Sequence, residues 1–269
     1  MQSIESLLAE FALHDPAGRI AQNDALRQDL VGLRLFDAPL VRVANASDPL
    51  FARFREPQAV GPIMRMPSDW LADARCVVSY FFPMSERVRT SNRAGRFASD
   101  EWFHARIQGQ AFIAAAGKRL CEHLRSRGFH AVCPVTEPDF EAHFLEEGDP
   151  DGSFCSNWSE RHVAYACGLG TFSLSKGIIT ERGTAGRFGS VVTDADLPVS
   201  ARPYNDLYEY CSRCGSCIAR CPVGAISIEE GKDHLRCYGA MMESKSVHPG
   251  YLGCGKCQVG IPCETGIPA

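Results

Sequence analysis

The sequence predicts an α+β fold in which a three-layer α/β domain is followed by a small cysteine-rich module. Segments typical of strands and of helices alternate through residues 1–200, which is the pattern of such layered domains. The stretch 196–206 (DLPVSARPYND) is polar, contains two prolines and marks a boundary. Eight of the 13 cysteines lie beyond it. We therefore expect the α/β domain over residues 1–200 and the module over 201–269.

The first half of the chain supplies most of the expected elements. Ser3 and Gly128 are typical of a helix start and a helix end, respectively. The segment 75–82 (RCVVSYFF) is β-branched and aromatic, which favours a buried strand. Helices are predicted for residues 3–14, 17–30 and 101–127, and strands for residues 40–43, 75–82 and 130–135.

After an acidic loop at 146–153, a helix is predicted from Ser159 to a stop at Gly168. Two strands, 172–180 and 188–193, should follow, joined by a glycine-containing turn. A short β-hairpin is expected at 225–233 inside the module.

Composition and charge exclude several classes of protein. The net charge of −4 does not favour general binding to nucleic acid. The first 11 residues (MQSIESLLAEF) lack the basic start and long apolar run of a secretory signal. No run of 18 apolar residues suggests a membrane span. We expect a cytoplasmic protein with no membrane partner.

The module begins with a run of four cysteines at C-x2-C-x2-C-x3-C-P spacing, residues 211–222. This is the bacterial ferredoxin pattern, in which the fourth cysteine ligates a second cluster. An isolated C-x2-C pair would leave zinc as an alternative, but the full run favours iron and sulfide. We predict two [4Fe–4S] clusters, one ligated by Cys211, Cys214, Cys217 and Cys263 and the other by Cys221, Cys237, Cys254 and Cys257.

Five cysteines lie outside the module. Free cysteine commonly packs as a small hydrophobe, and reactivity needs an exposed, electropositive site. We therefore interpret Cys76, Cys121, Cys133, Cys155 and Cys167 as packing residues, with Cys155 the least certain because it follows a polar loop.

Two segments of the first domain resemble the epoxyqueuosine reductase family. Residues 160–170 (ERHVAYACGLG) resemble its E-x8-GLG helix, and residues 176–193 (KGIITERGTAGRFGSVVT) resemble its GK…FGS…T stretch. Arg96-Phe97-Ala98 with Phe103-His104 is similar to its R-Y-A…Y-H segment. The order of the eight cysteines also matches, so the resemblance covers residues 60–263.

The resemblance implies a nitroreductase-like α/β domain that holds a base-off cobalamin beside the ferredoxin-like module, an arrangement shared with reductive dehalogenases. The clusters would pass electrons from an external low-potential donor to cobalt for reduction of a small substrate. Two alternatives stay open. The same fold could bind FMN, or the chain could be a non-enzymatic electron-transfer or reductive-activation protein for a redox partner.

The resemblance also suggests site residues. Glycine permits close approach of backbone to a ligand, and basic side chains can bind the phosphate or amide edges of a cofactor. The cofactor-binding candidates are Gly168, Gly170, Lys176, Arg187, Gly189 and Phe97. The catalytic residue is unknown, with Tyr165, His104 and His162 as weak candidates.

Three departures from the family pattern stand out. Phe154 occupies the position of the family's acidic proton donor, and Asp149 and Asp151 are out of register. Glu264 follows the last ligand where the pattern has proline. The sequence stops at Ala269 without the helical repeats of the longer reductases, so we do not expect a tRNA substrate.

Overall fold

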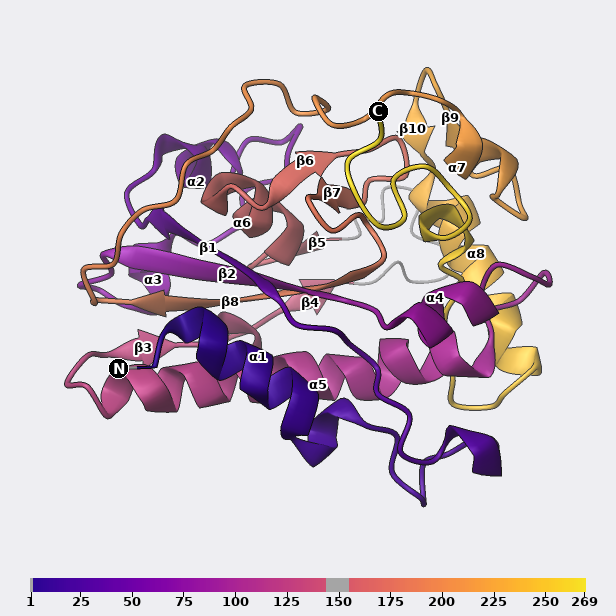
Figure 1. Ribbon diagram of the computed structural model, residues 1–269. Helices are drawn as coiled ribbons and strands as arrows, with labels where there is room; N and C mark the ends of the chain where they lie inside the picture. Colours follow the sequence, from indigo (N-terminus) through magenta and orange to yellow (C-terminus); the bar gives the residue numbers. More distant parts are fainter. Residues whose placement is uncertain (1, 144–154) are drawn as a thin grey trace.

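A computed structural model describes the chain over residues 2–143 and 155–269. Its centre is an antiparallel four-stranded sheet with the strand order β1–β2–β8–β3 (Figure 1). The strands are β1 (Leu40–Asn45), β2 (Cys76–Pro83), β8 (Gly186–Thr193) and β3 (Ala131–Val132).

Strand β2 is the central strand because its sequence is apolar on both faces. All eight of its residues are buried. It pairs along its whole length with β8, from Cys76 opposite Thr193 to Pro83 opposite Gly186. Strand β3 is much shorter and pairs only with the last two residues of β8, so the first half of β8 has one edge without a neighbouring strand.

Helices cover both faces of the sheet and make three layers (Figure 1). Helix α1 (Ile4–His14) and the long helix α5 (Asp100–Arg125) pack on one face, where Tyr80 and Phe82 lie among their apolar residues. Helix α6 (Glu160–Cys167) packs on the other face with Val77 and Val192. The shorter helices are α2 (Pro49–Arg53), α3 (Pro67–Trp70) and α4 (Glu86–Ser91). None of the described helices is both long and apolar enough to cross a bilayer.

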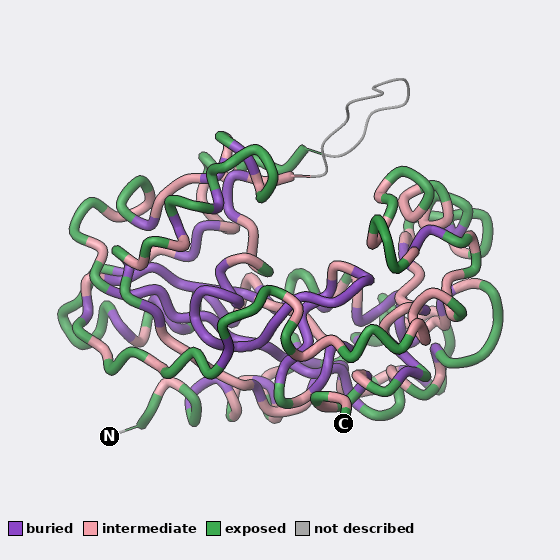
Figure 2. Tube along the Cα trace, turned by 90° about the horizontal axis from the view of Figure 1, so that it is seen from above, coloured by how far each residue is buried: buried purple, intermediate pink, exposed green. Residues whose placement is uncertain are grey.

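The remaining elements are short. Two two-stranded sheets lie outside the main one, and the module contains two helices and the expected hairpin. These elements are β4 (Ala142–His143) with β5 (Cys155–Ser156), β6 (Gly170–Phe172) with β7 (Ile178–Thr180), α7 (Ser216–Ala219), β9 (Ile226–Ser227), β10 (Gly231–Lys232) and α8 (His234–Glu243). Figure 2 shows that buried residues concentrate in the sheet and its covering helices, whereas the module is mostly half-buried or exposed.

The α+β fold and several elements agree with the sequence prediction, but two predicted elements are wrong. Residues 17–30 form no long helix; short 3-10 turns lie at Pro16–Gly18 and Gln28–Leu30, and backbone hydrogen bonds such as Ile20 N to Leu33 O (3.1 Å) fold the stretch back on itself. Residues 172–180 are not one strand, because the chain turns back at Lys176, whose φ is +57°. They form the end of β6, a turn and β7 instead. The predicted strand 130–135 shrinks to β3.

The buried ammonium of Lys256 attaches the module to the first domain. Lys256 is 2% exposed, and its Nζ donates to three oxygens: Asn92 O (2.9 Å), Asn92 Oδ1 (3.3 Å) and Ala94 O (2.6 Å). The Asn92 side chain in turn donates to the carbonyl of Cys254 (2.9 Å). A buried charge is tolerated only when it is well hydrogen-bonded. All three acceptors of the Lys256 ammonium belong to the first domain, so its hydrogen bonds join the module to that domain.

Glu264 makes a second contact across the same junction. Its carboxylate, 4% exposed, pairs with Arg89 (3.2 Å) and Arg93 (2.8 Å) and accepts from the N–H of Gly260 (2.6 Å). Burial opposes the charge, but hydrogen bonds from Arg93 and Gly260 outweigh it and lower the pKa of Glu264. The glutamate that departs from the family pattern thus has a structural role of its own.

We expect Lys256→Met to destabilise the protein by about 3 kcal/mol, because it leaves buried oxygens without a donor. Thermal unfolding should show this loss, and hydrogen exchange should show weaker protection in residues 92–94 and 254–264. Lys245→Met, at an exposed position, is the matched control. Equal stability of the two variants would contradict this role for Lys256.

Glu160 is a buried acid at the start of α6. Both of its carboxylate oxygens are shielded from solvent, and no well-formed hydrogen bond reaches them from the described residues. Burial raises its pKa to about 7, although the hydroxyl and backbone N–H of Ser190 act in the opposite direction. The folded protein therefore binds a proton at Glu160 more tightly than the unfolded chain does.

The neutral form of Glu160 contributes to the free energy of unfolding. This contribution should be fully present below pH 4.5 and should be lost as the pH rises through 7. Glu160→Gln removes this dependence, so it should stabilise the protein by up to about 3 kcal/mol at pH 8 and little at pH 4.5. Melting temperatures measured across this range test the prediction, with the exposed Glu122→Gln as control. Parallel profiles for wild type and Glu160→Gln would exclude it.

Candidate iron–sulfur site

The four cysteines predicted to ligate the first cluster line one cavity. Its walls come from both parts of the chain. Three of the cysteines come from the first run, whereas Cys263 arrives from the end of the module. The other lining residues are Ser173, Leu174, Ser175 and Ile179 from the first domain, and Ser212, Gly215, Ser216, Ile261, Pro262 and Pro268 from the module.

The loop carrying the first run adopts two left-handed residues. Arg213 has a φ of +52° and Gly215 a φ of +74°. Left-handed backbone turns the chain sharply, which glycine accepts without strain. The turns bring Cys211, Cys214 and Cys217 to the same cavity although only two residues separate each pair.

The thiols around this cavity influence one another electrostatically. The pKa of Cys263 is raised to about 12, first by burial and then by Cys211 and Cys217. The pKa of Cys217 is raised to about 11, by burial and then by Cys257, Cys211 and Cys214. Thiolates so close together need a cationic partner, and bound iron would supply it.

The second predicted set shows the same mutual influence. Burial raises the pKa of Cys254 to about 11, and Cys257 and Cys237 add to the effect. Burial also raises the pKa of Cys257, to which Cys237 and Cys221 contribute. Cys221 therefore lies near the second set, although it is the last cysteine of the first run. The interaction of Cys257 with Cys217 places the two sets next to each other.

In the part of the chain that the structure describes, no three His, Cys, Asp or Glu side chains converge on a point suited to a single metal ion. The ligand assignment for both clusters stays a prediction.

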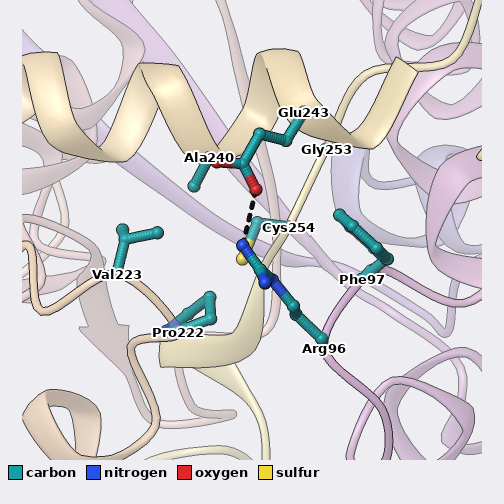
Figure 3. Close-up of a pocket in the computed structure, with 8 residues that line it drawn as sticks. All are labelled: Arg96, Phe97, Pro222, Val223, Ala240, Glu243, Gly253 and Cys254. Carbon is teal, nitrogen blue, oxygen red and sulfur yellow. Dashed lines mark hydrogen bonds and ion pairs between the residues drawn. The ribbon is translucent and has the colours of Figure 1, made fainter. Parts of the chain in front are cut away.

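A second cavity lies beside Cys254, between residues 96–97 of the first domain and the module. Figure 3 shows the Arg96 guanidinium pointing toward the Glu243 carboxylate, with which it pairs at 2.8 Å. Phe97, a cofactor-binding candidate, lines this cavity and not the other one. The remaining lining residues are Pro222, Val223, Ala240 and Gly253.

Each candidate glycine has a packing reason for lacking a side chain. Gly168 ends α6 with a φ of +92°, and a Cβ there would lie 2.6 Å from the carbonyl oxygen of Ala201. A Cβ on Gly170 would lie 1.9 Å from the Ile179 oxygen, and one on Gly189 would meet the Tyr80 ring. Cofactor binding by these glycines stays a prediction.

Two of the catalytic candidates, His104 and Tyr165, are buried, and His162 is half-buried. His104 is fully buried; Nε2 accepts from Leu26 N (3.2 Å) and Nδ1 lies 3.0 Å from Gln108 Oε1. Burial lowers the pKa of His162 to about 4, so this ring is neutral at pH 7. Burial raises the pKa of Tyr165, which keeps its phenol protonated.

Lys176 and Arg187 belong to a group of basic residues that the sequence did not reveal as a group. Burial, and then repulsion from Arg106 and Arg161, lower the pKa of Arg187 to about 9. Lys176 is similarly affected by burial and by Lys232. These residues come from distant parts of the chain, so only the resemblance drew attention to two of them.

Four of the five cysteines outside the module are buried, as packing residues are: Cys76, Cys121, Cys133 and Cys167. Burial raises the pKa of each. Cys155 is half-buried. Asp149, Asp151 and Phe154, which concern the proton donor, lie outside the described residues.

Comparison with known proteins supports the module and the fold. Residues 206–227 match the family model of the 4Fe-4S binding domain. No curated protein matches the chain as a whole.

The chain is similar to solved structures of two kinds of reductase. An epoxyqueuosine reductase from Streptococcus thermophilus is 15% identical, with a TM-score of 0.51 over 84% of this chain and 62% of that one. An epoxyqueuosine reductase in complex with a tRNA stem loop is 17% identical, with a TM-score of 0.51 over 85% and 62%. A catabolic reductive dehalogenase in complex with 3-bromo-4-hydroxybenzoic acid is 16% identical, with a TM-score of 0.54 over 86% and 30%.

The chain thus spans about three fifths of the length of the epoxyqueuosine reductases it matches. At these identities the likeness concerns the fold. The protein has the α+β fold of the epoxyqueuosine reductase and reductive dehalogenase cores, with a 4Fe-4S binding domain at residues 206–227.

Proposed function

We propose that this chain is an iron–sulfur oxidoreductase that passes electrons through two [4Fe–4S] clusters to a bound cofactor, base-off cobalamin, for reduction of a small substrate. The observation that carries the proposal is the cavity shared by Cys211, Cys214, Cys217 and Cys263. In bacterial two-cluster ferredoxins the fourth cysteine of the first run ligates the other cluster. Cys221 is the fourth cysteine here, and its charge helps to raise the pKa of Cys257, a predicted ligand of the second cluster.

The residues present suit the groups that the proposal needs. Four cysteines around one cavity provide a complete thiolate set for a cubane. For the organic cofactor, Lys176 and Arg187 are the residues that would hold it, since a basic side chain can bind its phosphate or amide edges. Phe97, Gly168, Gly170 and Gly189 remain further candidates. When bound, the clusters supply single electrons and a corrinoid supplies a strongly reducing metal centre.

The path of the electrons follows from the placement of the two sets. The first set includes Cys214, which is exposed, so this set is suited to receive electrons from an external low-potential donor. The second set lies beside Arg106 and Arg161, on which Cys237 acts electrostatically. The chain's own residues then hold the acceptor and exclude water, while the cofactor performs the reduction.

Protein purified without oxygen should contain about eight irons and eight sulfides per chain. Cys214→Ala should remove one cluster and Cys237→Ala the other. Each variant should therefore keep about half of the iron of the wild-type protein. Cys221→Ala should alter the same paramagnetic resonance signal as Cys254→Ala, not that of Cys214→Ala. The control is Cys155→Ser, outside the module. A total of four irons, or one zinc without sulfide, would refute the two-cluster proposal.

The cofactor is tested by absorbance titration of the cluster-loaded protein with cob(II)alamin and with FMN. We expect cobalamin to bind with loss of its lower base ligand, because the fold is that of reductive dehalogenase cores. Binding of FMN alone would point to a flavin reductase on the same fold. Binding of neither, with turnover only after addition of a redox partner, would favour the non-enzymatic electron-transfer alternative.

A further inference from the structure

A serine hydroxyl lies against the sulfur of an exposed predicted ligand. The Oγ of Ser216 and the Sγ of Cys214 are 3.3 Å apart and share a hydrogen bond, in which the free thiol donates to the hydroxyl oxygen. Both residues line the cavity of the four cysteines predicted to ligate the first cluster. Because Cys214 is exposed, this hydroxyl lies at a part of the cavity wall that solvent reaches.

The backbone between the two residues brings the hydroxyl back to the sulfur. Gly215, which separates them, has a φ of +74°, and left-handed backbone turns the chain sharply. Ser216 then begins α7, whose N-cap is Gly215, without a hydrogen bond from a side chain. The Ser216 hydroxyl is therefore not used to cap the helix. Within the described ranges its hydrogen-bond partner is the sulfur of Cys214.

Ligation of iron would reverse the direction of this hydrogen bond. A cysteine that ligates iron is a thiolate, which has lost its proton and can only accept. The hydroxyl of Ser216 carries a hydrogen of its own and can donate it to the sulfur. A hydrogen bond to an ionised acceptor is stronger than one between neutral groups. The pair of side chains thus suits the ligating form of Cys214 better than the free thiol.

The second predicted set has a hydrogen bond to sulfur from the backbone instead. The N–H of Ala225 donates to the Sγ of Cys221 (3.2 Å). A backbone donor does not depend on the side chain of its residue, whereas a single substitution removes the Ser216 hydroxyl. The direct effect of such a substitution is therefore confined to the first set.

Hydrogen bonds to sulfur are among the factors that set the reduction potential of an iron–sulfur cluster. Reduction adds one electron to the cluster, so its sulfurs become more negative. A hydrogen-bond donor at a sulfur therefore stabilises the reduced form more than the oxidised form, which raises the potential.

We propose that Ser216 raises the reduction potential of the first cluster by donating a hydrogen bond to the sulfur of Cys214. The proposal deepens the function proposed above and rests on it for the first cluster and for Cys214 as its ligand. Both residues lie within the match to the 4Fe-4S binding domain. The consequence is that the first cluster accepts an electron from a less reducing donor than it would without this hydroxyl. Ser216 acts through a ligand and does not touch the substrate.

The test is a redox titration of cluster-loaded protein, followed by paramagnetic resonance of the two clusters. The first cluster of Ser216→Ala should need a more negative potential for reduction. At the potential that reduces half of the wild-type first cluster, its ratio of reduced to oxidised form should be about fivefold lower, as expected for the loss of one hydrogen bond. The signal of the second cluster should titrate as it does in the wild type.

Two further variants separate the hydrogen bond from the loss of a side chain. Ser216→Thr keeps the hydroxyl and should restore the wild-type titration. Ser246→Ala removes an exposed hydroxyl of the same module, which donates to Glu243 O (2.7 Å), and should leave both clusters unchanged. Resonance Raman spectra should show a higher frequency for the stretch between iron and cysteine sulfur in Ser216→Ala, because a sulfur that accepts no hydrogen bond binds iron more strongly.

The proposal is overturned if the first cluster of Ser216→Ala keeps the wild-type potential, or if Ser216→Thr shifts as far as Ser216→Ala. An equal shift of both clusters would also overturn it, because it would show a general change in the module. Iron and sulfide are measured on every sample. Wild-type protein without the first cluster would contradict the proposed function, whereas a complete set of clusters with an unchanged potential would contradict only the role of Ser216.

Discussion

Two buried charges of opposite sign hold the end of the module against the loop between α4 and α5. The Lys256 ammonium and the Glu264 carboxylate both bond to residues 89–94. Three predicted cluster ligands, Cys254, Cys257 and Cys263, lie in the same short stretch of chain. The geometry of both predicted cluster sites therefore depends on this contact, and so does the distance between the clusters and the α/β domain.

Glycines allow the close approach that this contact requires. A Cβ on Gly255, whose φ is +68°, would overlap the Trp102 ring. A Cβ on Gly183 would lie 2.2 Å from the backbone carbonyl oxygen of Glu264. At Gly255 the backbone of the module thus lies against a side chain of the first domain, and at Gly183 the two backbones lie against each other. Neither place has room for a further side chain. This packing favours a fixed relation between them over a tethered one.

The net charge of the whole chain conceals a local excess of positive charge. The chain carries −4 overall, yet Arg106, Arg161 and Arg187 act on one another electrostatically. A local field depends on which charges lie nearby and not on their total. The total charge of the chain therefore does not describe the field around these three arginines.

The sequence predicted what is local in the chain and missed what is assembled from distant segments. The spacing of Cys211 to Cys221 and the capping of α1 by Ser3 depend on neighbouring residues, so the sequence alone predicts them. The stretch 17–30 was predicted to be a helix, but Ile20 in it forms backbone hydrogen bonds with Gly32 and Leu33 instead. Arg106 and Arg187 belong to α5 and β8, which are far apart in the sequence, and only the fold brings them together.

One wall of the first cluster cavity comes from the β6–β7 turn of the other domain. The cavity therefore exists only when residues 173–179 and 211–263 are both in place. During synthesis the N-terminal part folds first, and Cys263 emerges 52 residues after Cys211. The proposed cluster could be received in the finished site only after the ribosome has made this whole region. Its loading would thereby follow translation of Cys263, the last predicted ligand.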